Sequence, residues 1–150
     1  MSKGIIAKAS QIIKSKTAAE NMGAGVALTL MDSDGYPSTS CISISKADGI
    51  TEILFGIGLS SSKGVRAKEC NRASVCIFDD DYENNSYYNI TLVGEVEIVT
   101  DPELKKDVWY EGLTEYFPQA AADPDYAVLR FTTKRYNLWV DMGEGLEGRI

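Results

Sequence analysis

Histidine is absent from this sequence of 150 residues. An imidazole is the usual general base of serine and cysteine hydrolases and a common ligand of protein-bound zinc. Its absence excludes those kinds of site, together with an imidazole acid–base step near neutral pH. If this protein carries out redox or group-transfer chemistry, we therefore expect a cofactor to supply the reactive group.

Cysteine is scarce, and long apolar runs are missing. Cys41, Cys70 and Cys76 contain no pair with CxxC spacing, and three cysteines cannot pair completely. Reduced thiols of this kind are typical of a cytoplasmic protein, which is the location we expect. No stretch approaches the ~20 apolar residues of a membrane span, and residues 1–16 lack the apolar core of a secretory signal. We expect no membrane association.

Positive charge is also in short supply, because 15 Lys and Arg residues face 22 Asp and Glu residues and leave a net charge of -7. This balance opposes general attraction to nucleic acid, so we expect no nucleic-acid partner. Any anionic ligand must find a local cationic pocket. The length and the 44% hydrophobic content are those of one ordinary globular unit, and we expect residues 1–150 to form a single domain.

The spacing of apolar residues predicts a mainly β protein with short helices. Residues 3–16 carry apolar side chains at helical spacing and predict a covering helix, and two further helices are expected over 62–71 and 102–113. Strands are expected where β-branched and aromatic residues gather between turn residues. These strands cover residues 25–32, 37–46, 53–57, 73–78, 87–99, 126–132 and 135–141.

Individual residues support several of these boundaries. Gly94 predicts a bulge or bend within the strand 87–99. Asp101 before Pro102 predicts a helix start, because the carboxylate can accept from free amides and a proline at the first position needs no amide partner. The remaining segments are expected to be a turn, an acidic loop and a glycine-rich tail, over residues 47–49, 79–86 and 143–150.

The order of these elements favours an antiparallel barrel over a doubly wound sheet, because most strands follow one another through turns rather than helical crossovers. The chain has neither a GxGxxG motif after a strand nor a GxxxxGK[ST] loop, so the common dinucleotide- and triphosphate-binding folds are not expected. The acidic run 79–83 lacks the alternating ligand spacing and the turn glycine of a calcium loop. No metal site is therefore expected.

The densest group of candidate binding residues is the stretch 58–66, which reads Gly-Leu-Ser-Ser-Ser-Lys-Gly-Val-Arg. It places hydroxyls, free helix amides and two cations, Lys63 and Arg66, where the chain passes from strand to helix. A helix N-terminus offers unpaired N–H groups and the positive end of a dipole, so the stretch suits a phosphate monoester. The same pattern also fits an ordinary serine cap followed by solvated cations.

Short motifs from about Gly25 to Asp141 follow a consistent order and spacing. They are Gly35-Tyr36-Pro37, Ser62-Lys63, Tyr87–Val99, Asp101–Leu104, Tyr116-Phe117-Pro118, Asp123–Tyr126 and Tyr136–Asp141. Together they resemble the general stress protein branch of the pyridoxamine 5'-phosphate oxidase family. The resemblance implies an antiparallel split β-barrel that forms a homodimer, with two FMN sites at the interface.

The same resemblance assigns residues to the FMN site. It implies that the flavin phosphate meets Ser62 and Lys63, with Ser60 as a companion. It implies an aromatic contact from the partner subunit at Trp139. It also places one strand segment beside the isoalloxazine ring, formed by Ser40, Cys41, Ile42 and Ser43.

The function that this resemblance implies is that of an FMN-binding oxidoreductase acting on a small molecule, and no residue is assigned as its acid or base. Family members often carry an arginine in the strand after the proline, whereas Pro37–Cys41 holds no cation. Two alternatives therefore stay open: a flavin protein that stores or senses its cofactor, and a split barrel that binds deazaflavin, haem or no ligand. In the true oxidase of this family, a C-terminal segment with Arg and His binds the phosphate of the vitamin substrate. The corresponding residues 143–150 contain Arg149 but no histidine, so the resemblance does not imply oxidation of pyridoxamine phosphate itself.

Overall fold

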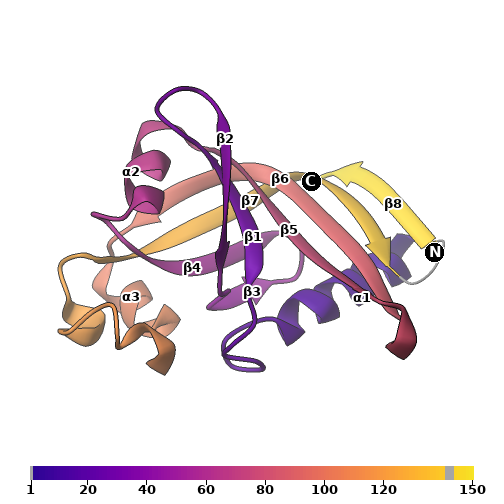
Figure 1. Cartoon of the computed structure of the whole chain (residues 1–150), viewed down its shortest axis with the longest axis horizontal. Helices are drawn as coiled ribbons and strands as arrows, with labels where there is room; N and C mark the ends of the chain where they lie inside the picture. Colours follow the sequence, from indigo (N-terminus) through magenta and orange to yellow (C-terminus); the bar gives the residue numbers. More distant parts are fainter. Residues whose placement is uncertain (1, 141–143) are drawn as a thin grey trace.

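The structure is a computed structural model that describes residues 2–140 and 144–150, and an antiparallel sheet forms its centre (Figure 1). Its strands are β1 (Val26–Met31), β2 (Pro37–Ile42), β3 (Lys46–Asp48), β4 (Glu52–Gly58), β5 (Arg72–Asp81), β6 (Ser86–Val99), β7 (Tyr126–Val140) and β8 (Glu144–Arg149). The helices are α1 (Ser2–Ser15), α2 (Ser62–Glu69) and α3 (Pro102–Val108). Single 3₁₀ turns cover Tyr82–Asn84, Glu111–Leu113 and Ala120–Ala122.

The connection between β2 and β3 forces the sheet to curl. The strand order is β2-β1-β5-β6-β7-β4-β3, with β8 added to β7, so β2 and β3 lie at opposite ends. A flat sheet of this order would separate its ends by about 29 Å. Only residues 43–45 join the two strands, and a chain of that length spans at most about 14 Å. The expected antiparallel split barrel is confirmed, with the split between β2 and β3.

Alternating side chains fill the barrel, and α1 covers one side of it (Figure 1). In β1, Val26, Leu28 and Leu30 are buried while the residues between them are partly exposed. The apolar stripe of α1 enters the same core through Ile5, Ala9 and Ile13, which confirms the predicted covering helix. Within the described residues, no helix is long and apolar enough to cross a membrane.

The last two predicted strands are one continuous strand, so that prediction is wrong. Val93 of β6 pairs with Arg135, and Gly94 pairs with Thr133, which leaves Lys134 of β7 as an extra residue. The bulge expected at Gly94 is therefore confirmed, and it shifts the alternation of β7 by one residue. In the sequence, this shift interrupts the alternation of buried and exposed residues, and the interruption resembles the gap between two strands. Residue 141, the expected strand end, lies outside the described residues.

The predicted glycine-rich tail is also wrong, because its described part forms β8. Gly145 faces Trp139 and Gly148 faces Tyr136 across the β7–β8 pair. A Cβ atom on Gly145 would lie 3.0 Å from Cε3 of Trp139, and one on Gly148 would collide with Oη of Tyr136. The rings cover the glycines and supply the packing that glycine lacks in a strand. Residue 143 lies outside the described residues.

Three other boundaries also differ from the prediction. The expected turn 47–49 begins as β3, which pairs with β4, so the expected strand 37–46 is divided in two. The expected loop 79–86 contains the end of β5, the start of β6 and a 3₁₀ turn, where the rings of Tyr82 and Tyr87 stack 5.1 Å apart. The helix expected over 102–113 ends at Val108. The first two differences depend on pairing or stacking with residues outside the segment.

Alanine at Asp101 is expected to lower the free energy of unfolding by about 1 kcal/mol, since it removes the cap of α3. The Asp101 carboxylate accepts from the backbone N–H of Leu104 at 3.0 Å. The midpoint of thermal unfolding, followed by circular dichroism, should fall by about 2–4 °C. Asparagine at this position keeps an accepting oxygen and should stay close to wild type. Equal losses for both variants would contradict the capping role.

Candidate functional site

A cavity of about 560 Å³, which we call the β2–β4 pocket, opens where the ends of β2 and β4 meet the start of α2. Of the eight residues predicted for the FMN site, Cys41, Ile42, Ser43 and Lys63 line this cavity. Residues separated by about 20 positions in the sequence therefore meet at one place. The other lining residues are Gly23, Gly25, Gly56, Ile57, Gly58, Ser61, Tyr110, Leu113, Tyr116, Phe117 and Asp125.

The hydroxyl at the start of α2 that lines the pocket belongs to Ser61 and not to Ser62. Ser61 is the N-cap: its Oγ accepts from the N–H of Gly64 at 3.3 Å and donates to the carbonyl of Gly58 at 2.6 Å. Ser62 is the first helical residue, is exposed, and is not among the lining residues. Three consecutive serines give the same capping signal, so only the backbone geometry decides which one caps the helix.

Gly64 lets α2 pack directly against the loop that precedes it. A Cβ atom at this position would lie 2.5 Å from the carbonyl oxygens of both Gly58 and Leu59. Lys63, next to it, is half-buried and reaches the pocket. Within the described part of the chain, no carboxylate lies within 4.0 Å of the Lys63 ammonium. The start of α2 therefore presents an unpaired cation beside free helix amides, an arrangement suited to an anion.

Ser60 and Ser40 do not line the pocket. Ser60 is turned toward Asp125: its backbone N–H donates to Oδ1 at 2.8 Å and its hydroxyl donates to Oδ2 at 2.9 Å. Ser40 of β2 pairs with Leu28 of β1 and is not a lining residue, although Ile42, on the same face of the strand, is one. Sequence reasoning missed Asp125, because its partner lies 65 positions away.

Aromatic residues form part of the pocket lining. Phe117 packs against Tyr126 with ring centroids 5.1 Å apart, and Tyr116 is 72% exposed at the rim. Burial raises the pKa of Tyr110, while a hydrogen bond with the Ser43 side chain opposes the shift. Burial raises the pKa of Tyr126 to about 12, and its hydroxyl donates to the carbonyl of Lys105 at 2.8 Å. Both phenols are therefore neutral at physiological pH.

Trp139 does not line this pocket. It lies 38% exposed on the outer face of β7 and lines a separate hollow of about 280 Å³ with Asn89 and Asn137. None of the residues lining that hollow lines the β2–β4 pocket. The structure of the single chain therefore does not bring Trp139 to the other predicted site residues.

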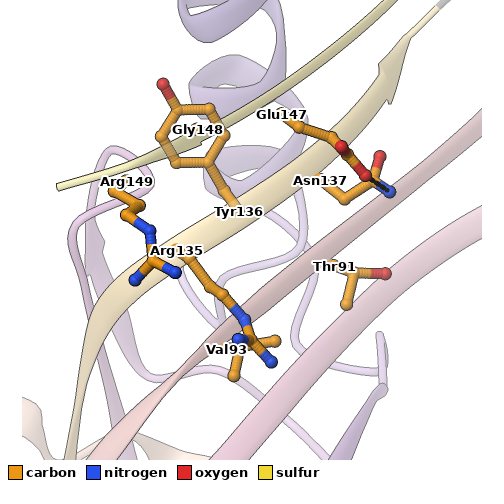
Figure 2. Close-up of a pocket in the computed structure, with 8 residues that line it drawn as sticks. All are labelled: Thr91, Val93, Arg135, Tyr136, Asn137, Glu147, Gly148 and Arg149. Atoms are coloured by element: carbon orange, nitrogen blue, oxygen red, sulfur yellow. Dashed lines mark hydrogen bonds between the residues drawn. The ribbon is translucent and has the colours of Figure 1, made fainter.

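A further hollow of about 450 Å³ lies over β6, β7 and β8 (Figure 2) and shares Thr91 and Asn137 with the hollow that Trp139 lines. Arg135 and Arg149 face each other across the β7–β8 pair and point to the same side of the sheet. The side-chain amide of Asn137 donates to Oε1 of Glu147 at 2.9 Å. The hollow is lined by Thr91, Val93, Arg135, Tyr136, Asn137, Glu147, Gly148 and Arg149.

In the part of the chain that the structure describes, no cluster of three acidic or cysteine side chains could hold a metal ion.

A known family matches most of the chain. The sequence model of the family described as pyridoxamine 5'-phosphate oxidase matches residues 16–140. The matched range includes β1 to β7, and with them every residue that lines the β2–β4 pocket. No curated protein matches the sequence.

Solved structures share the fold over nearly the whole chain. A protein related to general stress protein 26 of B. subtilis, from Clostridium acetobutylicum, is 23% identical with a TM-score of 0.80, covering 100% of this chain and 97% of that one. General stress protein 26 from Bacillus anthracis is 15% identical with a TM-score of 0.75, covering 96% and 98%. A heme binding protein from Mycobacterium smegmatis is 16% identical with a TM-score of 0.71, covering 96% of this chain and 57% of that one. At these identities the likeness establishes the fold.

Proposed function

This chain belongs to the pyridoxamine 5'-phosphate oxidase family, and on that basis we propose that it binds FMN in the β2–β4 pocket and acts as a flavin-dependent oxidoreductase. The observation that carries the proposal is the composition of this one pocket. It combines Lys63, which has no acidic partner among the residues that the structure describes, with a helix start, a strand end and several aromatic side chains. FMN has a dianionic phosphate at one end and a planar ring system at the other, so both ends find suitable groups.

The phosphate end fits the start of α2. Lys63 supplies positive charge, and the first amides of the helix supply donors that have no partner within the helix. Ser61 adds a hydroxyl on the same wall. In a chain of net charge -7, this local cation offsets surroundings that would otherwise repel a phosphate.

The ring end fits the edge strand β2. This strand lies at the end of the sheet order, so one edge of its backbone has no neighbouring strand. Unpaired N–H and C=O groups along residues 40–43 can hydrogen-bond the polar edge of a flavin. Tyr110, Tyr116 and Phe117 line the same pocket and offer aromatic surface to the ring. Bound FMN would supply the hydride or electron transfer, and the protein would position it.

We also propose that the protein is a homodimer in which Trp139 of one subunit completes the pocket of the other. Two observations support this arrangement. Trp139 lies outside the pocket of its own chain, and the outer face that carries it also exposes Phe78, with Asn89 between them in register. Exposed aromatic side chains aligned on a sheet are typical of a protein interface. A two-fold axis would give both subunits the same contact.

The protein as purified is expected to show flavin absorption bands, and denaturation should release FMN. Apo protein titrated with FMN should quench the flavin fluorescence and saturate at one FMN per subunit, and sedimentation should give a dimer at micromolar concentration. Haem would lack its commonest axial ligand here, because the chain contains no histidine. A Soret band, or a colourless protein that ignores added FMN, would overturn the proposal.

Catalysis is tested separately from binding. If the protein is an oxidoreductase, anaerobic NADH or NADPH should bleach the bound flavin at a rate compatible with turnover. A flavin that binds tightly but is not reduced by either donor would favour a storage or sensing role for the same pocket.

A further inference from the structure

Asp125 is the one acidic residue among those that line the β2–β4 pocket, and the proposed function gives it no role. A carboxylate beside a phosphate site is unfavourable because like charges repel. Its position therefore needs a reason. The reason lies in the loop between β4 and α2, residues 59–61, which carries the groups proposed to meet the phosphate.

Asp125 holds this loop through three hydrogen bonds. The N–H of Leu59 donates to the backbone carbonyl of Asp125 at 2.7 Å. The N–H and the hydroxyl of Ser60 donate to the two carboxylate oxygens at 2.8 and 2.9 Å. Both oxygens are thus engaged, and two consecutive backbone amides of the loop are fixed by the same residue.

The loop is confined from the other side by α2. A Cβ atom at Gly64 would lie 2.5 Å from the carbonyl oxygens of Gly58 and Leu59, and one at Gly58 would lie 3.0 Å from Oδ2 of Asp125. The loop therefore lies closely packed between the carboxylate and the first turn of the helix. Displacement of the loop would move Ser61, which caps the helix through its side chain.

Asp125 is itself fixed by a second acidic residue. Oδ1 of the buried Asp123 accepts from the N–H of Asp125 at 3.0 Å, and Oδ2 accepts from the N–H of Gln119 at 3.2 Å. The ammonium of Lys105 donates to the backbone carbonyl of Asp123 at 3.1 Å. The segment 123–125 is thus anchored to α3 before it contacts the loop, so Asp125 can set the position of the loop.

We propose that Asp125 is a positioning residue for the phosphate site, holding residues 59–61 so that the Ser61 cap and Lys63 face the bound phosphate. This inference rests on the proposed function. It requires the two side-chain hydrogen bonds between residue 125 and Ser60 and not the negative charge of Asp125. Asparagine keeps an oxygen for the Ser60 amide and offers an NH₂ group to the Ser60 hydroxyl, and it removes a negative charge from beside the phosphate.

The test measures FMN and riboflavin affinities of apo wild type, Asp125→Asn and Asp125→Ala by fluorescence quenching. Asp125→Ala should bind FMN about tenfold more weakly or worse, the loss expected when one hydrogen bond to a charged group is removed, with a much smaller change for riboflavin. Asp125→Asn should bind FMN about two- to fivefold more tightly than wild type, because a repulsive charge is gone. A role in general stability would not give opposite directions for the two variants.

A ligand-free readout and two further variants complete the test. Amide hydrogen exchange at Leu59 and Ser60 should accelerate in Asp125→Ala and stay near wild type in Asp125→Asn. Asp107→Asn removes an equal charge at an exposed residue that bonds Lys46, away from the pocket, and should leave FMN affinity unchanged. If Asp125→Ala fails to fold, Ser60→Ala takes its place, and the loss of the hydroxyl bond should weaken FMN binding about threefold.

The outcomes separate this inference from the proposed function. Wild-type protein that binds neither flavin overturns both. Wild-type protein that binds FMN while Asp125→Ala, or its replacement Ser60→Ala, binds it equally well overturns only the positioning role. An Asp125→Asn variant that loses as much FMN affinity as Asp125→Ala also overturns it, because the hydrogen bonds would then not be what matters.

Discussion

Alanine in place of Lys63 is expected to weaken FMN binding by about ten- to 150-fold and to leave riboflavin binding almost unchanged. A hydrogen bond to a charged group contributes roughly 1.5–3 kcal/mol, and this range corresponds to that loss of affinity. Lys63 is the lysine that lines the β2–β4 pocket, and among the described residues it has no acidic partner from which it would have to be released. Riboflavin has no phosphate, so the comparison isolates the phosphate contact.

Lys68→Ala provides the matched control for this experiment. Lys68 lies on the same helix, is exposed, and does not line the pocket. Its replacement by alanine therefore removes an equal charge without removing the proposed contact with the FMN phosphate. Both flavins are titrated into apo wild type and both variants by fluorescence quenching. Equal losses of FMN and riboflavin in Lys63→Ala would indicate misfolding, and an unchanged FMN affinity would refute the assignment. Arg66, one helical turn further along, would then be the next candidate.

Alanine at Gly94 is expected to lower the free energy of unfolding by about 3 kcal/mol or more, at the upper end of the usual cost of overpacking. The added Cβ would collide with the backbone carbonyl oxygen of Thr132 and lie 2.9 Å from its carbonyl carbon. Both are backbone atoms of a central strand that pairs on both edges, so they cannot move aside without breaking the β6–β7 ladder. The midpoint of thermal unfolding should fall by about 6 °C or more.

Gly4→Ala is the matched control, because it makes the same substitution with the opposite expected sign. Gly4 lies in α1, and no atom lies within 4 Å of the position of an added Cβ. Alanine there should raise the stability by up to about 1 kcal/mol through the greater helix propensity of alanine. The midpoints of thermal unfolding of both variants, compared with that of the wild type, test these two expected changes in stability. A Gly94→Ala protein as stable as wild type would show that the bulge does not require glycine.

The fold could be predicted from the sequence to a large extent. Apolar spacing over residues 3–16 predicts a helix that the structure contains, and the β-rich runs predict most of the strands. The order of the short motifs identified the family and the split barrel. Such features are local, since a stripe of apolar residues or a capping carboxylate acts on its own segment.

The errors of prediction fall where a distant segment decides the local structure. Residues 144–150 read as a tail because two glycines lower the strand propensity, and only the rings of Tyr136 and Trp139 make up for the missing side chains. The single strand β7 reads as two, because the bulge at Lys134 is defined by pairing with Gly94 and not by β7 alone.

The candidate site divides in the same way. The sequence by itself determined that a phosphate site, if there is one, begins at the serine-rich start of α2, because hydroxyls, a cation and a helix start are all local properties. Only the tertiary structure decided that Ser61 is the cap, that Ser60 is bonded to Asp125, and that Trp139 lies outside the pocket of its own chain. The bond between Ser60 and Asp125 spans 65 positions of sequence, and the place of Trp139 depends on how the strands pair, so neither is encoded in a local pattern.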